Sequence, residues 1–163
     1  MNNTGAKLTQ KILVPHDGSE MSDRALDKAI EFAKVLGADI IILHILDDKL
    51  IPSGAIMSFL GAKSSTVMDA KLQILNIVKI GAEQLLKDRT EKVSKNGINV
   101  RFIMGMGSPA DGVANVAKNE NIDLIIMGSK ELEKENNNKI KLLGSVTRRV
   151  SEISDCPVMI VKH

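Results

Sequence analysis

Short apolar stretches alternate along the chain with longer segments in which apolar residues recur every three or four positions. The short stretches are nearly continuous in aliphatic residues, which is typical of strands buried on both faces of a parallel sheet. They predict strands at Ile12–Val14, Ile40–Leu46, Val100–Met104, Ile122–Met127 and Val158–Val161. The longer segments predict helices at Ser19–Leu36, at about Thr66–Ser94, from Ser108-Pro109 onward and at about Ser145–Ile153. Strands that alternate with helices in this way predict an α/β fold, with a parallel sheet covered by helices on both faces.

Residues at the helix ends support these boundaries. Ser19 is a good N-cap for the first helix, and Gly37 stands where a glycine in the left-handed conformation commonly ends a helix. Ser108 and Pro109 fit the N-cap and first position of another helix. The long helix carries a stripe at spacings of three and four that predicts its core-facing side: Met68, Leu72, Leu75, Val78, Ala82 and Leu85.

Two segments break the apolar pattern and predict loops. Asp47 to about Ser65 contains proline, glycine and clustered serine, with room for one helical turn around Met57–Leu60. Glu131–Lys141 is charged and rich in asparagine, and we interpret it as a solvated surface excursion. The length of 163 residues predicts a single domain, residues 1–163, with a flexible N-terminal segment at residues 1–10.

Composition excludes several classes of function. The formal net charge of +2, with 26% charged residues, is ordinary and indicates neither a nucleic-acid partner nor an anionic membrane surface. Three phenylalanines are the whole aromatic complement, so stacking platforms for single-stranded nucleic acid are almost absent. The single Cys156 excludes an intrachain disulfide and is interpreted as a small buried filler. With no signal peptide and no run of about 20 apolar residues, the expected location is the cytoplasm.

Two glycines near the C-terminal end form a candidate anion site. Gly128 ends a predicted strand, where the absence of a side chain is expected to let a ligand approach the backbone. Gly144 opens a predicted helix, whose first N–H groups have no partner within the helix and, with the helix dipole, favour phosphate. Arg148 and Arg149, one turn into that helix, are interpreted as ordinary solvated arginines.

Other candidate residues admit two interpretations each. Asp17 follows the first strand, where it either accepts hydrogen bonds from an adenine amine or a ribose hydroxyl, or only organises the turn before the helix. The segment Gly105–Ala110 fits a loose dinucleotide fingerprint, but Ser108-Pro109 already explains the helix start there. His44 lies within a predicted buried strand and is interpreted as a satisfied core histidine.

From about Lys11 to Lys162 the chain resembles the universal stress proteins. The resemblance rests on the order and spacing of several short motifs: Ile12-Leu13-Val14-Pro15-His16-Asp17-Gly18-Ser19, Ile42-Leu43-His44-Ile45, Ile125-Ile126-Met127-Gly128-Ser129, Leu142-Leu143-Gly144-Ser145-Val146-Thr147 and Cys156-Pro157-Val158-Met159-Ile160-Val161. It implies a five-stranded parallel sheet of Rossmann-like, adenine nucleotide alpha hydrolase-like architecture.

In the nucleotide-binding branch of that family, the resemblance implies a site for ATP, or for ADP or AMP, together with Mg²⁺ or Mn²⁺. Gly128 and Gly144-Ser145 match the ends of the pattern Gly-x2-Gly-x9-Gly-Ser/Thr. The implied nucleotide-binding residues are Pro15, His16, Asp17, Ile45, Met127, Gly128, Lys130, Gly144, Ser145, Val146 and Thr147.

The chain departs from this pattern at its middle position. Glu131 stands in place of the middle glycine, and twelve residues instead of nine separate it from Gly144. The longer loop adds carboxylates beside a phosphate site, which would repel an anion unless Mg²⁺ or the loop lysines intervene.

The leading hypothesis is a homodimeric, regulatory protein that binds an adenine nucleotide. The last strand is expected to form a sheet edge, and an apolar edge invites pairing with a second copy through Val158, Met159, Ile160 and Val161. The second hypothesis is a dimeric interaction protein of the same fold that does not bind nucleotide. A slow ATP hydrolase ranks last, because no general base or arginine finger can be assigned.

Overall fold

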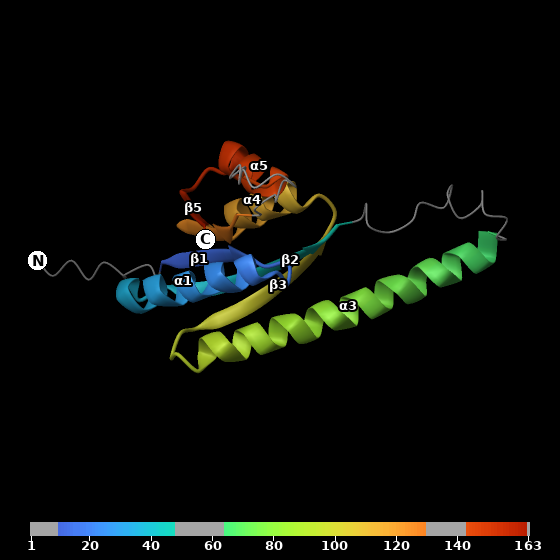
Figure 1. Ribbon diagram of the computed structural model, residues 1–163, viewed down its shortest axis with the longest axis horizontal. Coiled ribbons are helices and arrows are strands. Elements are labelled where there is room, and N and C mark those ends of the chain that lie inside the picture. Colours follow the sequence, from blue (N-terminus) through green and yellow to red (C-terminus); the bar gives the residue numbers. More distant parts are fainter. Residues whose placement is uncertain (1–9, 48–63, 130–142, 163) are drawn as a thin grey trace, which may run out of the picture.

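The computed structural model describes residues 10–47, 64–129 and 143–162, and it has the predicted α/β fold (Figure 1). The strands are β1 (Lys11–Pro15), β2 (Asp39–Leu46), β3 (Val100–Met106), β4 (Leu124–Gly128) and β5 (Val158–Val161). The helices are α1 (Glu20–Leu36), α3 (Ser64–Ser94), α4 (Pro109–Asn119) and α5 (Ser145–Ile153). The predicted loops at 47–65 and 131–141 and the N-terminal segment lie almost entirely outside the described residues.

The strands form one five-stranded sheet in the order β3-β2-β1-β4-β5, and every pair of neighbours is parallel. Figure 1 shows α1 and α3 on one face of this sheet and α4 and α5 on the other. The five-stranded parallel sheet with helices on both faces is therefore confirmed. In the described part of the chain, β5 and β3 are the two edges.

Alternate residues of the central strands belong to two separate hydrophobic cores, one on each face of the sheet. On the side of α1 and α3, Ile12, Val14, Ile40 and Ile42 pack with Leu86 of α3. On the opposite side, Leu13, Ile41, Leu43 and Ile125 pack with helix residues such as Val113 of α4 and Val150 of α5. Because both faces of β1 and β2 are buried, the nearly continuous apolar runs of the sequence are explained.

The predicted helix caps are mostly confirmed. The Ser19 hydroxyl accepts a hydrogen bond from the Ser22 N–H at 3.2 Å, and Gly37 ends α1 with a φ of 65°. Ser108 and Pro109 occupy the N-cap and first position of α4, but the Ser108 side chain makes no capping hydrogen bond. Short-range signals therefore located these helix ends correctly.

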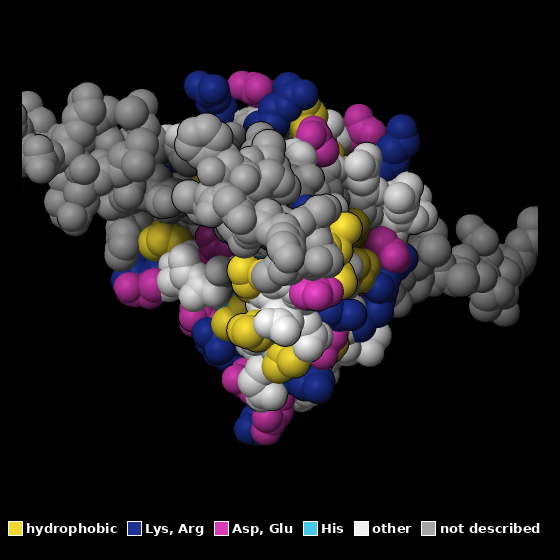
Figure 2. Space-filling view, turned by 90° about the vertical axis from the view of Figure 1, so that its right-hand side faces the viewer, with side chains coloured by type: hydrophobic (Ala, Val, Ile, Leu, Met, Phe, Trp, Pro, Cys, Tyr) yellow, Lys and Arg dark blue, Asp and Glu magenta, His cyan; other side chains and the backbone are white. Residues whose placement is uncertain are grey.

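The prediction for the apolar stripe of α3 is wrong over the first half of the helix. Ala82 is buried, but Met68 and Leu72 are 58% and 57% exposed, and Val78 is also exposed. The reason is geometric, since this part of α3 projects beyond the sheet in Figure 1. Figure 2, seen from that side, accordingly shows hydrophobic side chains at the surface among charged ones. Leu86 and Val93, which lie further along α3, are also buried.

Candidate functional site

Strands β1 and β4 diverge toward their carboxyl ends, and this divergence opens the site. β1 pairs with β2 from Lys11 to Pro15, but with β4 only at Ile12 and Leu13. Strand order reverses at this point, because β2 and β3 follow on one side of β1 and β4 and β5 lie on the other. In open α/β sheets, ligands bind at the carboxyl ends of strands beside such a reversal.

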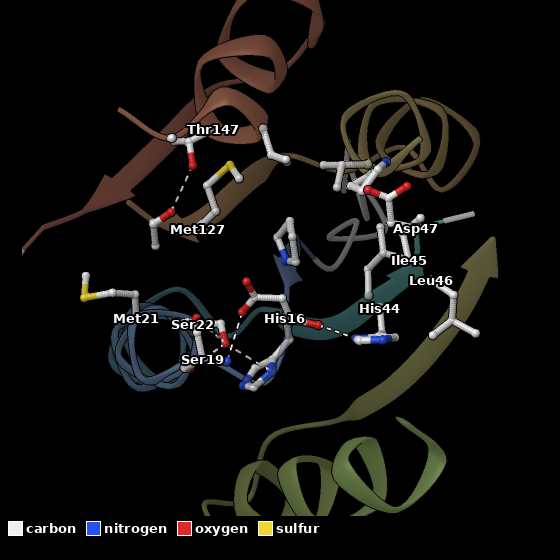
Figure 3. A pocket seen from close by; sticks show the side chains of 18 of the residues that line it. His16, Ser19, Met21, Ser22, His44, Ile45, Leu46, Asp47, Met127 and Thr147 are labelled. Carbon is white, nitrogen blue, oxygen red and sulfur yellow. Dashed lines mark hydrogen bonds between the residues drawn. The ribbon is translucent and has the colours of Figure 1, made fainter. Parts of the chain in front are cut away.

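A cleft of about 990 Å³ occupies this position. It is lined by every predicted site residue that the structure describes: Pro15, His16, Asp17, Ile45, Met127, Gly128, Gly144, Ser145, Val146 and Thr147. Lys130 lies outside the described residues. In Figure 3, Met127 and Thr147 lie across the pocket from His16, Ser19 and Ser22. The fold thus brings together residues that are more than a hundred positions apart in the sequence.

The N-terminus of α5 faces the cleft without a capping side chain. Gly144 is the N-cap residue, and no side chain caps the helix there. The first turn contains no acidic residue, so no carboxylate of that turn neutralises the positive end of the helix dipole. Ser145 and Val146 are exposed at this end. Among the described residues the N–H groups of this first turn have no acceptor, which suits an anion.

Thr147 and Gly128 fix this helix end to the sheet. The Thr147 hydroxyl donates a hydrogen bond to the Gly128 carbonyl at 3.1 Å, and Thr147 is buried. Glycine at position 128 also has a packing role. A Cβ at Gly128 would lie 2.6 Å from the Met21 backbone oxygen, so the missing side chain makes room for α1, and Gly128 lines the cleft as well.

Asp17 both organises its turn and faces the cleft, so the two interpretations of this residue are compatible. Its Oδ1 accepts a hydrogen bond from the Ser19 N–H at 3.0 Å, while Ser19 itself caps α1. Partial burial by itself raises the pKa of Asp17, but hydrogen bonds from Ser19 and Ser22 outweigh it and hold the pKa below its ordinary value. Asp17 therefore presents an ionised carboxylate, which only accepts hydrogen bonds, at neutral pH.

The His16 ring lies beneath this turn and is only 2% exposed. Its Nδ1 accepts a hydrogen bond from the Gly18 N–H at 3.2 Å, so in the neutral ring Nε2 carries the proton and donates it to Asp23, also at 3.2 Å. Burial lowers the pKa of His16 from its ordinary value of 6.5, and the hydrogen bond and charge of Asp23 offset this only in part. Both ring nitrogens are thus engaged within the protein.

Asp23 also pairs with Arg89 of α3. Its two carboxylate oxygens accept hydrogen bonds from Nε and Nη2 of Arg89, each at 2.9 Å. Partial burial raises the pKa of Asp23, but the hydrogen bonds from Arg89 and His16 prevail, and the pKa lies below its ordinary value. A planar guanidinium matched to a carboxylate in this way is both strong and geometrically specific.

Gly105 and Gly107 of the apparent dinucleotide fingerprint, like Gly112 two residues after it, serve packing and a turn. Cβ atoms at Gly105 and Gly112 would lie 2.7 Å and 2.9 Å from Cδ1 of Ile45, which fills the space between β3 and α4. Gly107 has a φ of 125°, which a residue with a side chain rarely adopts. These roles explain the glycines without a bound dinucleotide. The Ile45 side chain lies against β3 and α4 as well as beside the cleft.

The model of a known family, described as the universal stress protein family, matches residues 9–162 of the chain. The chain belongs to the universal stress protein family. Universal stress protein YxiE of Bacillus subtilis is 33% identical over 152 residues, covering 93% of this chain and 98% of YxiE. Universal stress protein MJ0577 of Methanocaldococcus jannaschii is 31% identical over 157 residues, covering 94% of this chain and 95% of MJ0577.

Solved structures agree with the fold of this universal stress protein. The structure of MJ0577 superposes with a TM-score of 0.76 at 29% identity, covering 94% of this chain and 96% of that chain. A universal stress protein from Archaeoglobus fulgidus, solved in complex with dAMP, superposes with a TM-score of 0.62 at 20% identity, covering 94% and 98%. The latter likeness shows the fold alone.

Several cleft residues of this universal stress protein were missed by sequence reasoning. They include Met21 and Ser22 of α1, His44 and Leu46 of β2 and Val78 of α3. His44, interpreted as a core histidine, is only half-buried, and its Nδ1 donates a hydrogen bond to the His16 carbonyl at 2.7 Å. A polar residue at a strand's carboxyl end was the available signal for His44, whereas no local signal marks Val78.

The remaining expectations concern residues outside the cleft. Cys156 is half-buried and not fully buried, because β5 is an edge strand, and burial raises the pKa of its thiol. Arg148 and Arg149 are exposed and lie near Glu152, as expected for solvated arginines. Among the described residues no three His, Cys, Asp or Glu side chains are grouped to hold a metal ion. The described helices include none with the length and apolar character needed to cross a bilayer.

Proposed function

We propose that this universal stress protein binds an adenine nucleotide, with the phosphates at the N-terminus of α5 and the nucleoside between Pro15–Asp17 and Ile45. The observation that carries the proposal is the uncapped first turn of α5, which opens onto the same cleft as the ionised Asp17. The relative from Archaeoglobus fulgidus that is in complex with dAMP supports the choice of an adenine nucleotide.

The cleft offers different chemistry at its two ends. At the α5 end, unpaired N–H groups and the hydroxyl of Ser145 suit phosphate oxygens. At the β1 end, Asp17 suits a ribose hydroxyl or an exocyclic amine, because both donate hydrogen bonds. Pro15, Ile45 and Met127 supply aliphatic surfaces for a base, in a chain that has no Trp or Tyr.

Both ATP and its shorter relatives fit this arrangement. The volume of about 990 Å³ lies at the upper end of the usual range of ligand sites, about 300–1,000 Å³. Mg²⁺ or Mn²⁺ accompanying ATP would be held mainly by phosphate oxygens and water, which is the common mode for Mg²⁺ with nucleotides. The described carboxylates that line the cleft are Asp17, Glu20 and Asp47.

We also propose that the protein forms a homodimer through β5. Val158, Met159, Ile160 and Val161 form an edge strand of the described sheet and are each only half-buried. An apolar edge with unpaired backbone groups is stabilised by pairing with another strand. Sedimentation of the protein alone tests this, because Ile160→Lys would place a charge at the edge and shift the protein to monomer.

Ser145 allows a sharp test of the phosphate site by calorimetric titration with Mg-ATP. Ser145→Pro removes one N–H from the first helical position, where proline is well tolerated. Gly144 has φ −56° and ψ 151°, a conformation that proline accepts in the residue before it. We expect Ser145→Pro to weaken binding by about tenfold or more, since a hydrogen bond to a charged group is worth about 1.5–3 kcal/mol.

The matched control is Ser145→Ala, which removes the hydroxyl but keeps the N–H. We expect it to retain more affinity than Ser145→Pro, with equal thermal stability for the two variants. Equal affinity of Ser145→Pro and wild type would contradict phosphate binding at α5. Absence of heat at millimolar ATP, ADP and AMP would instead favour the second hypothesis, an interaction protein of this fold without a nucleotide.

A further inference from the structure

One side of α3 runs along the Asp17 turn of the cleft. Val78, Leu85 and Arg89 are seven and four positions apart, which places them on the same side of the helix. Val78 lines the cleft, and both Cδ atoms of Leu85 lie 3.8 Å from the position that a Cβ of Gly18 would occupy. Arg89 binds Asp23. α3 therefore touches the cleft wall, the turn and the support beneath the turn.

The Arg89–Asp23 pair continues into the turn through His16. Asp23 accepts from Nε2 of His16, and Nδ1 of the same ring accepts from the N–H of Gly18, the residue after Asp17. Because Arg89 occupies both carboxylate oxygens, it fixes the position of the oxygen that holds His16. The hydrogen bonds thus form a continuous series from α3 to the backbone beside Asp17.

β2 holds the same backbone from the other side. The His44 Nδ1 donates to the His16 carbonyl at 2.7 Å, as the dashed line in Figure 3 shows. The turn is thereby fixed at the carbonyl of residue 16 by β2 and at the N–H of residue 18 by the series that begins on α3. Asp17 stands between these two points, so their positions determine where its carboxylate lies.

We propose that Arg89 is a positioning residue for the ligand cleft, and that docking of α3 onto α1 and occupancy of the cleft stabilise each other. This inference rests on the proposed function for its ligand. Coupling between two sites is reciprocal, so a ligand that orders the Asp17 turn must also strengthen the attachment of α3. Through α3, the presence or absence of a ligand in the cleft would in this way affect the exposed first half of the helix.

The chain provides a matched control for Arg89. Lys92, one turn further along α3, pairs with Asp27, so this second ion pair joins the same two helices. Lys92 is not in contact with His16 through any described hydrogen bond, and its pair is more exposed than that of Arg89. If Arg89 only attached α3 to α1, Arg89→Met and Lys92→Met would have the same kind of effect.

Two measurements on the full chain test the inference: amide hydrogen exchange at Gly18 without ligand, and calorimetric affinity for Mg-ATP. In Arg89→Met we expect Gly18 to exchange about tenfold faster and ATP to bind about five- to fiftyfold more weakly, within the usual range of coupling. In Lys92→Met both should stay within about twofold of wild type, as for an exposed ion pair. In wild type, ATP should slow exchange along α3 from Val78 to Arg89.

Arg89→Lys provides a variant that stays folded if Arg89→Met does not. It keeps the positive charge but loses the two-fold match to the carboxylate, so we expect a smaller change in the same direction. Unchanged Gly18 exchange in Arg89→Lys and Arg89→Met, or an equal change in Lys92→Met, would overturn the inference. Failure of wild type to bind any nucleotide would contradict the proposed function, while the exchange rates would still decide whether Arg89 positions the turn.

Discussion

A Cβ atom on Gly128 would lie 2.6 Å from the backbone oxygen of Met21, so β4 and α1 approach each other only because residue 128 has no side chain. We expect Gly128→Ala to lower the free energy of unfolding by about 1–3 kcal/mol, since backbone atoms must shift to admit the methyl group. Denaturant unfolding measures this change.

Gly81 supplies the control for that substitution. It lies within α3 and a Cβ there meets nothing within 4 Å. Gly81→Ala should therefore raise the free energy of unfolding by up to about 1 kcal/mol, because alanine is the better helix former. A loss of stability in both variants would show that the contact with Met21 is not the cause.

Gly105 and Ile45 should show strong coupling. Gly105→Ala alone is expected to destabilise the protein by about 1–2 kcal/mol, because its Cβ would lie 2.7 Å from Cδ1 of Ile45. Ile45→Val removes that carbon atom, so in the double variant the cost of Gly105→Ala should largely disappear. A double-mutant cycle by denaturant unfolding measures the coupling, and additive effects would contradict it.

The Thr147 hydroxyl is expected to matter for stability more than its methyl group does. Thr147→Val removes the hydrogen bond to the Gly128 carbonyl and should cost about 1–2 kcal/mol, because a partly buried acceptor loses its partner. Thr147→Ser keeps the hydroxyl and should cost less. Thermal unfolding measures the stability of the two variants. A larger loss in Thr147→Ser than in Thr147→Val would show that this hydrogen bond does not anchor α5.

Stability should fall as pH decreases below about 6.5, the ordinary pKa of histidine, because of His16. Its folded pKa lies below its unfolded value, so the unfolded chain binds the proton first. The contribution of His16 is therefore complete above 6.5 and is lost as pH falls toward the folded pKa. Within that window the slope of the free energy of unfolding against pH has an upper limit of about 1.4 kcal/mol per pH unit, the value for one proton.

Denaturant unfolding between pH 7.5 and 5 checks this prediction in wild type and in His16→Asn. The charges around the ring also act on the folded pKa of His16: Asp23 and Asp17 raise it, and Arg89 lowers it. The lowered pKa values of Asp17 and Asp23 act in a separate window, because carboxylates lose their contribution below about pH 4. The same slope in both proteins would assign the pH dependence to other groups.

Local chemistry made most of the fold predictable from the sequence. Ser19, Gly37 and Pro109 mark helix ends by their own conformational preferences, and the runs at β1 and β2 are aliphatic because both faces of these strands are buried. The α3 stripe was misjudged because Met68 and Leu72 continue the spacing of Ala82, while only the length of the sheet decides which of them is covered.

Site residues were predictable where a motif or a strand end marked them. Asp17 and Gly144 follow from their places at the end of β1 and the start of α5. The packing role of Gly128 was not predictable, because the nearness of Met21 depends on how α1 packs on the sheet. Arg89 and Asp23 are separated by 66 positions, and no spacing in the chain links a pair that only the docking of α3 brings together.

The short pairing between β1 and β4 has a mechanical consequence. In the described part of the chain, β1 and β4 are paired at Ile12 with Leu124 and at Leu13 with Ile125, with one further backbone hydrogen bond from Asp123 to Lys11. β2 and β3, by contrast, are paired over seven positions. Under load, the strands should therefore separate more readily along this line than between β2 and β3. A ligand in contact with both Asp17, after β1, and Ser145, at the start of α5, would hold the two halves of the sheet together. The force needed to separate them would then be higher when the cleft is filled.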